Sequence, residues 1–327
     1  MKTIDRCPCT LAEGYNTYSP KAVRHFLAGK SVSHILPYPS APNGSDSSLF
    51  DANRRRFSLS GAQSKYSAVI DGNTFRLTKE GEKGSYILKP ALSDFQNREN
   101  SPANEHLTMQ IASQVFGIET AENGLCFFED GEVAYMVKRY DVRQDGTRIQ
   151  QEDFASLAGL SAEKNGHNYK YESTSYEDIG NLIRRFLPAW PVEVVKYFDV
   201  LLFNFLFANG DAHIKNFSVL KTDDGDYRLA PAYDLINTLI HIPGDTIFAL
   251  RKGLYNGWTD RYVTGEDFLE FATRIGINSK VAERELERFC ADYSLIDSLI
   301  DRSFLAEDIK EQYRGIYKVR LKSFLRA

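Results

Sequence analysis

Asp211 and Asn216 stand five residues apart, directly after a strongly apolar stretch of the chain. In phosphoryl-transfer enzymes an Asp five residues before an Asn forms the pattern D-x-x-x-x-N, in which the Asp accepts the proton of a hydroxyl and the Asn binds Mg²⁺. Asp234 offers a second carboxylate of the kind that a divalent ion on nucleotide phosphates requires. The three residues predict a kinase, with Asp211 as the base and Asn216 and Asp234 as metal ligands.

A lysine and a glutamate further upstream complete the order of residues expected in a kinase. Lys89 ends the apolar β-type run 85–90, which is the character of the kinase strand lysine that pairs with phosphates and with a helix glutamate. Glu105 lies in a predicted helix and shares a face with Met109 and Ala112. A carboxylate facing inward needs a cation, so we expect an ion pair between Lys89 and Glu105. The simpler alternatives are an exposed lysine at a strand edge and a glutamate that complements the helix N-terminus.

The elements that position these residues change type near residue 143. Before it, the sequence predicts a short helical pattern at 15–36, a hairpin at 66–77, strands at 85–90, 124–129 and 133–140, and a helix at 102–116. After it, helices are predicted at about 152–160, 176–187, 193–208, 265–275, 280–300 and 306–325, with a hairpin at 217–230. We therefore expect an α+β, two-lobed protein-kinase-like fold with an N-terminal arm and linker (1–50), a β-rich N-lobe (51–143) and a mostly helical C-lobe (144–327).

The predicted helix 193–208 is apolar on almost every face, which is typical of a buried core helix. Its end delivers residues 209–216 onto a loop, and irregular backbone fixed by a rigid element is the usual support for catalytic residues. The hairpin at 217–230 then returns the chain toward this loop. Asn216 and Asp234 can therefore share one metal ion.

Composition narrows the class of protein. A formal charge of −4 argues against a chain that mainly coats nucleic acid, and a hydrophobic share of 43% suits a globular core. Four scattered cysteines and the lack of an apolar signal core favour a reducing cytoplasm, while Cys7 and Cys9 lack the second ligand pair that a zinc site needs. The longest apolar run is far shorter than the ~20 residues that span a bilayer.

The chain resembles the HipA-like serine/threonine kinase toxins. The resemblance is carried by residues 209–218 (NGDAHIKNFS), 231–235 (PAYDL), 86–90 (YILKP), 104–105 (NE) and 57–65 (FSLSGAQSK). These segments extend over about residues 55–240, and the helical tail is similar in character to the family's C-terminal lobe.

The resemblance implies a kinase toxin of a type II toxin–antitoxin system that uses ATP and Mg²⁺ and stops translation by phosphorylating a protein such as an aminoacyl-tRNA synthetase. It also implies a HipB-like DNA-binding antitoxin as a partner and autophosphorylation at Ser58 or Ser60, where neighbouring arginines would receive the phosphate. The implied nucleotide-binding residues are Ser60, Gly61, Ala62, Gln63, Ser64 and Lys65 over the phosphates, with Lys89 also on the phosphates. Lys138, Arg139 and Tyr140 form the implied adenine hinge, and His213, Lys215, Asn216, Tyr233 and Asp234 complete the set.

Two departures from the long members refine the expectation. About a hundred N-terminal residues of those members are missing here, and the Ser58-Leu59-Ser60 segment looks more like the short HipT kinases of three-gene HipBST systems, in which a small HipS-like protein replaces the missing subdomain. Lys138 stands where long members have an acid, so side-chain contacts to adenine differ there.

Two other functions fit parts of the pattern. A small-molecule phosphotransferase of the antibiotic-kinase type also uses a Gly-Asp-x-x-x-x-Asn loop, although the serine-rich segment and His213 favour the toxin family. A non-catalytic partner that represses transcription together with an antitoxin is the second alternative. Every catalytic position is intact, which favours an active enzyme.

Overall fold

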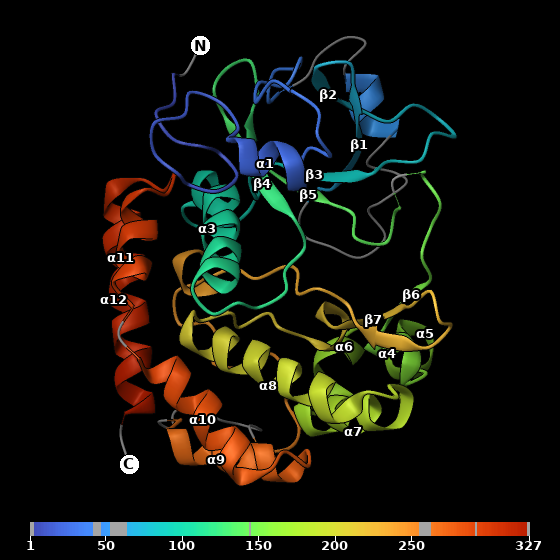
Figure 1. Ribbon diagram of the computed structural model, residues 1–327, viewed down its shortest axis with the longest axis vertical. Coiled ribbons are helices and arrows are strands. Elements are labelled where there is room, and N and C mark those ends of the chain that lie inside the picture. The colour runs from blue at the N-terminus through green and yellow to red at the C-terminus, as the bar shows by residue number, and fades with distance from the viewer. Residues whose placement is uncertain are drawn as a thin grey trace. The chain divides into compact units, whose positions relative to one another are not determined.

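The computed structural model describes residues 3–41, 47–52, 64–143, 145–254, 263–291 and 293–325 (Figure 1). The chain forms two compact units, and each of them draws on separate stretches of sequence. The first combines Met1–Ile111, Ala121–Arg148 and Leu295–Lys310; the second combines Ala112–Thr120, Ile149–Ser294 and Glu311–Ala327. The first unit holds a five-stranded sheet and the second is mostly helical, which confirms the predicted α+β class.

The sheet of the first unit is antiparallel, with the strand order β2-β1-β3-β5-β4. Its strands are β1 (Tyr66–Asp71), β2 (Thr74–Leu77), β3 (Tyr86–Lys89), β4 (Asn123–Phe127) and β5 (Val133–Lys138). Gly72, at φ 59°, makes the tight turn between β1 and β2, where a side chain would be strained. Lys89 is paired with Tyr135 of β5, so the end of β3 lies inside the sheet rather than at its edge.

Helices of the first unit, among the residues that the structure describes, include α1 (Pro20–His25), α3 (Ser101–Gln114, up to Ile111 in this unit) and α11 (Ser294–Asp301). In Figure 1 α3 runs beside β4, and Gln110 of α3 donates a hydrogen bond to the Asn123 side chain of β4 (3.0 Å). The predicted helix at 15–36 is only α1, because consecutive left-handed residues, Ala28 (φ 52°) and Gly29 (φ 82°), stop it.

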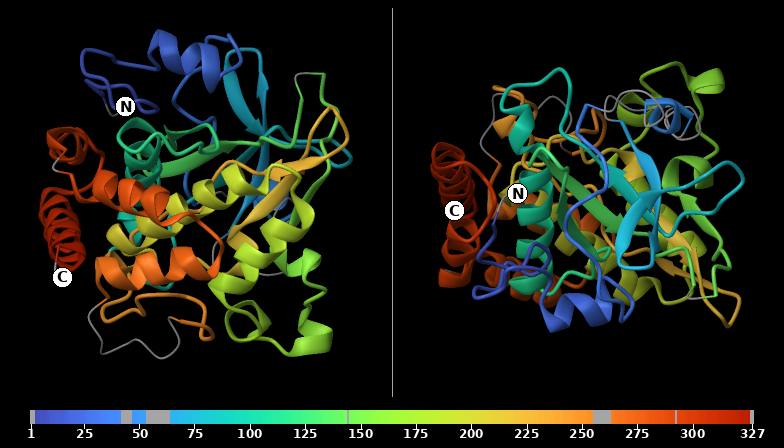
Figure 2. Two further views of the ribbon diagram at one scale, coloured as in Figure 1. Left: turned by 60° about the horizontal axis from the view of Figure 1, so that its bottom comes forward. Right: turned by 90° about the horizontal axis from the view of Figure 1, so that it is seen from above.

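The second unit is built on α8 (Trp190–Leu206), which buries residues on most of its faces. Helices α7 (Tyr176–Phe186) and α10 (Ser279–Cys290) pack on α8, and α9 (Gly265–Arg274) packs on α10 (Figure 2). Phe205 of α8 contacts the rings of Phe248, Phe268 and Phe324. The second unit also contains α4 (Phe154–Leu157), α5 (Ala162–Asn165), α6 (Tyr169–Glu172), the part of α12 (Glu307–Phe324) from Glu311 on, and a sheet in the order β6-β7-β8 (Gln151–Asp153, Ser218–Lys221, Tyr227–Leu229).

Two helix predictions in the second unit differ from the structure. The segment 152–160 starts as strand β6, since residues 151–153 pair with β7, and Asp153 then caps α4 by accepting a hydrogen bond from the Ser156 amide. The segment 280–300 is two helices, because α10 ends at Cys290 and the next residue, Ala291, is extended before α11 begins. Within the described ranges, no helix is long and apolar enough to cross a membrane.

Candidate active site

The loop that follows α8 begins at a helix end fixed by the backbone. Ala208 takes a left-handed conformation (φ 53°), and the amide of Asn209 donates to the carbonyl of Asn204 (2.8 Å), which closes the last turn. The phenol of Tyr176, on α7, donates to the carbonyl of Ala212 (3.0 Å). The loop is thus held by the core of its own unit.

The side chain of Asn209 connects the loop to Asp234. Its Oδ1 accepts a hydrogen bond from the Asp211 amide (3.3 Å), and its Nδ2 donates to the Asn204 side chain (3.0 Å) and to the carbonyl of Asp234 (3.3 Å). The backbones that carry the two predicted acids are therefore tied to one buried amide. The sequence prediction did not assign this role to Asn209, although its place directly before Gly-Asp was the available signal.

Asp211 presents an exposed carboxylate on this loop. Its Oδ1 accepts a hydrogen bond of 2.7 Å from the hydroxyl of Tyr171, which lies on the four-residue helix α6. Gly210, just before it, donates its amide to Oγ1 of Thr238 (3.0 Å). An accessible carboxylate at the end of a rigid element can accept a proton from an incoming hydroxyl.

Asn216 and Asp234 have features that suit oxygen ligands of a cation. Asn216 ends the 3₁₀ turn Ile214–Asn216, and its Oδ1 is buried with no hydrogen-bond partner within the described ranges. Asp234 is half-buried and takes the left-handed conformation (φ 56°), which is uncommon for a non-glycine residue and typical of functional positions. Carboxylate and amide oxygens are the ligand types that Mg²⁺ accepts, so these residues fit a magnesium ion bound to phosphates.

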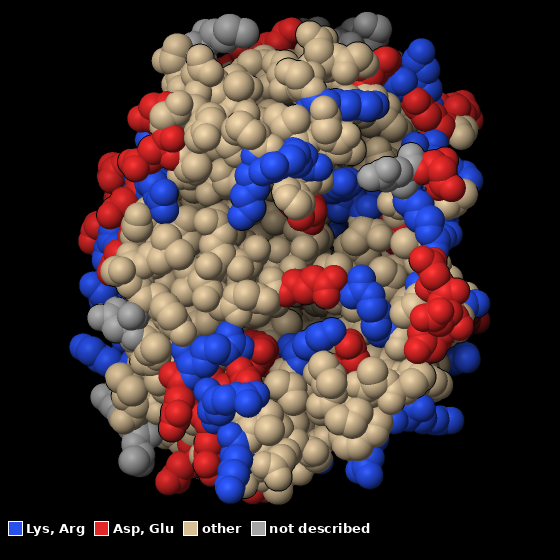
Figure 3. Space-filling model, in the orientation of Figure 1, with Lys and Arg blue, Asp and Glu red and all other residues tan. Residues whose placement is uncertain are grey.

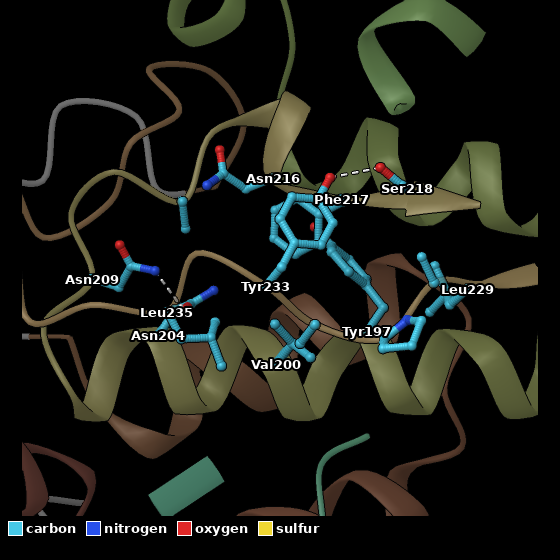
Figure 4. A pocket seen from close by; sticks show the side chains of 14 residues that line it. Tyr197, Val200, Asn204, Asn209, Asn216, Phe217, Ser218, Leu229, Tyr233 and Leu235 are labelled. Atoms are coloured by element: carbon cyan, nitrogen blue, oxygen red, sulfur yellow. Dashed lines mark hydrogen bonds between the residues drawn. The ribbon is translucent and has the colours of Figure 1, made fainter. Parts of the chain in front are cut away.

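A small pocket lies beneath Asn216. Its lining comes from α8, the loop, the start of β7, the end of β8 and the segment that follows: Tyr197, Val200, Asn204, Asn209, Ala212, Asn216, Phe217, Ser218, Leu229, Ala230, Pro231, Ala232, Tyr233 and Leu235. In Figure 4 the ring of Tyr233 crosses the middle of the pocket, and the amides of Asn209 and Asn216 lie to one side of it. The Tyr233 hydroxyl is hydrogen-bonded to Ser218 (2.6 Å) and donates to the carbonyl of Lys215 (2.8 Å). Tyr233 thus fixes the backbone beside Asn216.

His213 and Lys215 are already engaged with residues of the same unit. Lys215 lies 3.3 Å from the carboxylate of Asp153 and is hydrogen-bonded to Tyr169, and its pKa is raised although burial opposes the charge. Burial lowers the pKa of His213, while the charges of Asp211 and Asp234 oppose that shift. The structure therefore supports His213 as a neutral imidazole near both acids.

The predicted residues of the first unit form a separate group. Nζ of Lys89 lies 2.6 Å from Glu105 of α3, both side chains are about 4% exposed, and the ammonium also lies over the ring of Tyr135 (5.3 Å). Nζ of Lys138 donates to the carbonyl of His25 (2.8 Å), and burial lowers the pKa of this lysine.

The rest of the predicted hinge and phosphate loop is only partly described. Arg139 forms two hydrogen bonds with Asp141 (2.9 and 2.6 Å), and Tyr140 is half-buried beside it. Ser64 and Lys65 are half-buried just before β1. Ser58, Ser60, Gly61, Ala62 and Gln63 lie outside the described residues.

Within each unit the structure brings together one group of predicted residues. Asp211, Asn216 and Asp234 belong to the helical unit, and Lys89 and Glu105 belong to the β-rich unit. Among the described residues, no three His, Cys, Asp or Glu side chains gather as a ready-made cation site. A metal ion would be held by Asn216, Asp234 and ligand phosphates rather than by a closed protein cage.

The two units define a protein-kinase-like fold of the HipA type, with a five-stranded sheet and its helix in one unit and an apolar helix followed by an Asp–Asn loop in the other. The family model described as "HipA-like C-terminal domain" matches residues 57–294. This chain belongs to that family.

Relatives and solved structures agree with this assignment. "Putative kinase Y4mE" of Sinorhizobium fredii is 30% identical over 272 residues, which cover 79% of this chain and 59% of that protein. A protein of Haemophilus influenzae named "Putative kinase" is 25% identical over 338 residues, covering 96% and 94%. The chain thus spans well under two thirds of the length of the first relative and nearly all of the second.

Two solved structures share the fold. HipA of Shewanella oneidensis, solved with HipB and operator DNA, has a TM-score of 0.65 at 21% identity, covering 82% of this chain and 65% of that one. The Helicobacter pylori proinflammatory kinase CtkA has a TM-score of 0.50 at 17% identity, covering 79% and 93%. At such identities the likeness concerns the fold alone.

Proposed function

We propose that this chain is an ATP-dependent serine/threonine protein kinase that acts as the toxin of a toxin–antitoxin pair. The observation that carries the proposal is the Asn209 side chain, which joins the backbone of Asp211 to the backbone of Asp234 on the loop after α8. Family membership supports the same activity.

In this proposal each residue has a defined chemical task. Asp211 accepts the proton of the substrate hydroxyl, because its carboxylate is exposed and held at a rigid helix end. Asn216 and Asp234 hold a Mg²⁺ ion, which would neutralise charge on the ATP phosphates. Lys89, oriented by Glu105, binds phosphate oxygens, and residues 60–65 cover them.

The proposal extends to partners and regulation. The HipA of S. oneidensis was solved with HipB and operator DNA, which supports a HipB-like antitoxin as the partner of this chain. On the face seen in Figure 3, Lys and Arg side chains lie interspersed with Asp and Glu side chains. The formal charge of −4 argues against direct DNA binding by this chain, so DNA contact is assigned to the antitoxin. An aminoacyl-tRNA synthetase is the proposed substrate, a small HipS-like protein is a further proposed partner, and Ser58 or Ser60 is the proposed autophosphorylation site.

The test compares wild type with Asp211→Asn, which keeps the size of the side chain and removes the base. With Mg²⁺ and γ-labelled ATP, the wild type is expected to incorporate phosphate at Ser58 or Ser60, as located by mass spectrometry, and to arrest growth on expression. Asp211→Asn is expected to lower the incorporation rate at least a hundredfold, since a positioned acid–base group typically contributes about 10²–10⁴. It is also expected to relieve the arrest.

Asp224→Asn, at the exposed turn between β7 and β8, is the matched control and is expected to behave as wild type. Equal phosphate incorporation by wild type and Asp211→Asn would contradict the assignment of the base. Phosphoproteomics of cells expressing the two proteins then identifies the substrate. A change confined to small metabolites would instead favour a small-molecule phosphotransferase.

A further inference from the structure

Helix α6 brings a phenol onto the proposed base. The Tyr171 hydroxyl donates to Oδ1 of Asp211 at 2.7 Å, a charge-assisted hydrogen bond of ordinary length. Within the described ranges, no hydrogen bond to Oδ2 of Asp211 is found. Only one oxygen of this exposed carboxylate is therefore occupied by the phenol.

The phenol can act only as a donor in this contact. Burial raises the pKa of Tyr171, and the neighbouring Asp211 carboxylate raises it further, so the hydroxyl keeps its proton at neutral pH. The ring of Tyr171 meets the ring of His213 edge to face, with centroids 5.2 Å apart. Because burial lowers the pKa of His213, its ring is a neutral imidazole and not a cation that would compete with the phenol for the Asp211 carboxylate.

Several contacts hold α6 in this position. The carbonyl of Tyr171 accepts a hydrogen bond from the Arg251 amide (3.0 Å), and the Arg251 side chain pairs with Glu172 (3.0 Å). At the first residue of α6, Tyr169 is hydrogen-bonded to Lys215, which also pairs with Asp153. A helix of four residues has little stability of its own, so these contacts are what keep Tyr171 beside the loop.

We propose that Tyr171 is a positioning residue for Asp211: by holding Oδ1, it orients the carboxylate so that Oδ2 remains for the substrate hydroxyl. This inference rests on the proposed kinase function. The same contact could instead place the phenol where the substrate hydroxyl must bind, so that it blocks the site. The fixed placement of α6 and the single occupied oxygen favour positioning, and the two roles predict opposite changes in rate.

The test is Tyr171→Phe, which keeps the ring and its contact with His213 and removes only the hydroxyl. We expect the rate of phosphate incorporation at saturating ATP to fall about ten- to a hundredfold, which is the range expected when a reacting group is misplaced. The ATP concentration that gives half the maximal rate is expected to stay within about twofold of wild type, because the change concerns the base and not the nucleotide.

Tyr293→Phe is the matched control, since its phenol donates to the backbone carbonyl of Arg288 (2.9 Å) away from the loop. It is expected to keep the wild-type rate. An unchanged rate in Tyr171→Phe overturns the inference, and a higher rate overturns it in favour of the blocking role. A lower rate with a melting temperature well below that of Tyr293→Phe, recovering fully at low temperature, also overturns it, since the role would be structural.

The experiments distinguish a failure of the proposed kinase function from a failure of the proposed role of Tyr171. A wild-type protein with no phosphate incorporation overturns the proposed function and this inference with it. An active wild type that loses its activity in Asp211→Asn, together with an unchanged Tyr171→Phe, overturns only the inference.

Discussion

Gly210, directly before the proposed base, lies where no side chain fits. A Cβ at this position would come closer than 3 Å to both the Asp245 carboxylate and the carbonyl of Thr246. Asp245 is itself hydrogen-bonded to Thr238, whose Oγ1 accepts from the Gly210 amide. The absence of a side chain at Gly210 therefore lets the loop approach Asp245 and Thr246 closely. The orientation of Asp211, the next residue, depends on this close approach.

Gly210→Ala is expected to destabilise the protein by about 1–3 kcal/mol, the usual cost of overpacking a tight site, and to lower the phosphorylation rate more than tenfold. Urea unfolding and phosphate incorporation measure the two effects. The control is Gly315→Ala on α12, where a Cβ meets nothing within 4 Å. That variant is expected to gain about 0.5–1 kcal/mol, because alanine is the better helix former. Equal stability of the two variants would contradict the argument.

The sequence predicted some residues of the candidate site and missed others for a physical reason. Asp211 and Asn216 follow the D-x-x-x-x-N spacing of phosphoryl-transfer enzymes, and Asp234 follows them as the second metal-binding carboxylate. Tyr171 has no such spacing, since it lies 40 residues before Asp211 on a helix too short to show a period. Its contact arises from the folding of the unit and not from local pattern.

The pairing of β3 with α3 depends on a charge pair that is almost fully buried. Removing one partner of such a pair leaves the other charge without compensation, which typically costs about 3–5 kcal/mol, whereas replacing both by apolar residues is often neutral. Glu105→Leu is therefore expected to destabilise the β-rich unit strongly. The double variant Lys89→Met/Glu105→Leu is expected to recover most of that stability while remaining inactive.

Urea unfolding followed by circular dichroism, together with phosphate incorporation, distinguishes these outcomes. If the double variant were as unstable as Glu105→Leu, uncompensated charge would not be the cause of the loss. A double variant that kept activity would remove Lys89 from the proposed phosphate site.

Elements with strong local signals were predicted, and elements made by tertiary pairing were not. Helix α7 has a capping box at Ser175 and an apolar face, and the hairpin of β1 and β2 has its Asp-Gly-Asn turn. Strand β6 has three residues and exists because β7 offers hydrogen bonds, a partner that no local pattern reveals. The predicted helix 152–160 was therefore wrong at its first two residues, which belong to β6, and right for α4.

At the scale of the whole chain, the sequence did not show that each unit is assembled from distant segments. The stretch 295–310 returns to the β-rich unit, where the Ala306 amide donates to the Asn100 side chain (2.9 Å) and Arg6 donates to the Ser303 carbonyl (3.4 Å). These contacts join residues about 200–300 positions apart. Periodicity and capping signals act over one or two turns, so they carry no information at this range.

The helical unit has a long-range connection of its own, a partly buried network of charged side chains between α8 and α10. Arg288 of α10 donates to Asp199 of α8 (2.6 Å), to Glu285 (2.8 Å) and to the carbonyl of Phe116 (2.6 Å). Asp199 thus shares its cation with a second carboxylate, and its Oδ1 is buried with no partner within the described ranges. Burial raises the pKa of Asp199 to about 7 despite Arg288.

This raised pKa predicts a decline in stability with rising pH. Between pH ~4 and ~7 the folded chain holds a proton on Asp199 that the unfolded chain has released, so the free energy of unfolding falls as pH rises through this window, by at most about 4 kcal/mol. Asp199→Asn removes the effect, because its side chain does not titrate. We therefore expect the wild type to lose stability relative to Asp199→Asn from pH 5 to pH 7.5.

Urea unfolding followed by tryptophan fluorescence suits this measurement, since Trp190 is the first residue of α8, the helix that carries Asp199. The lowered pKa of His213 has the opposite effect, because a histidine kept neutral in the folded chain stabilises it increasingly as pH rises toward its unfolded value. That contribution is common to both proteins and cancels in their difference. A difference between wild type and Asp199→Asn that stays constant across this pH range would show that Arg288 keeps Asp199 ionised in the folded protein, and that the network is a permanent ion pair between α8 and α10.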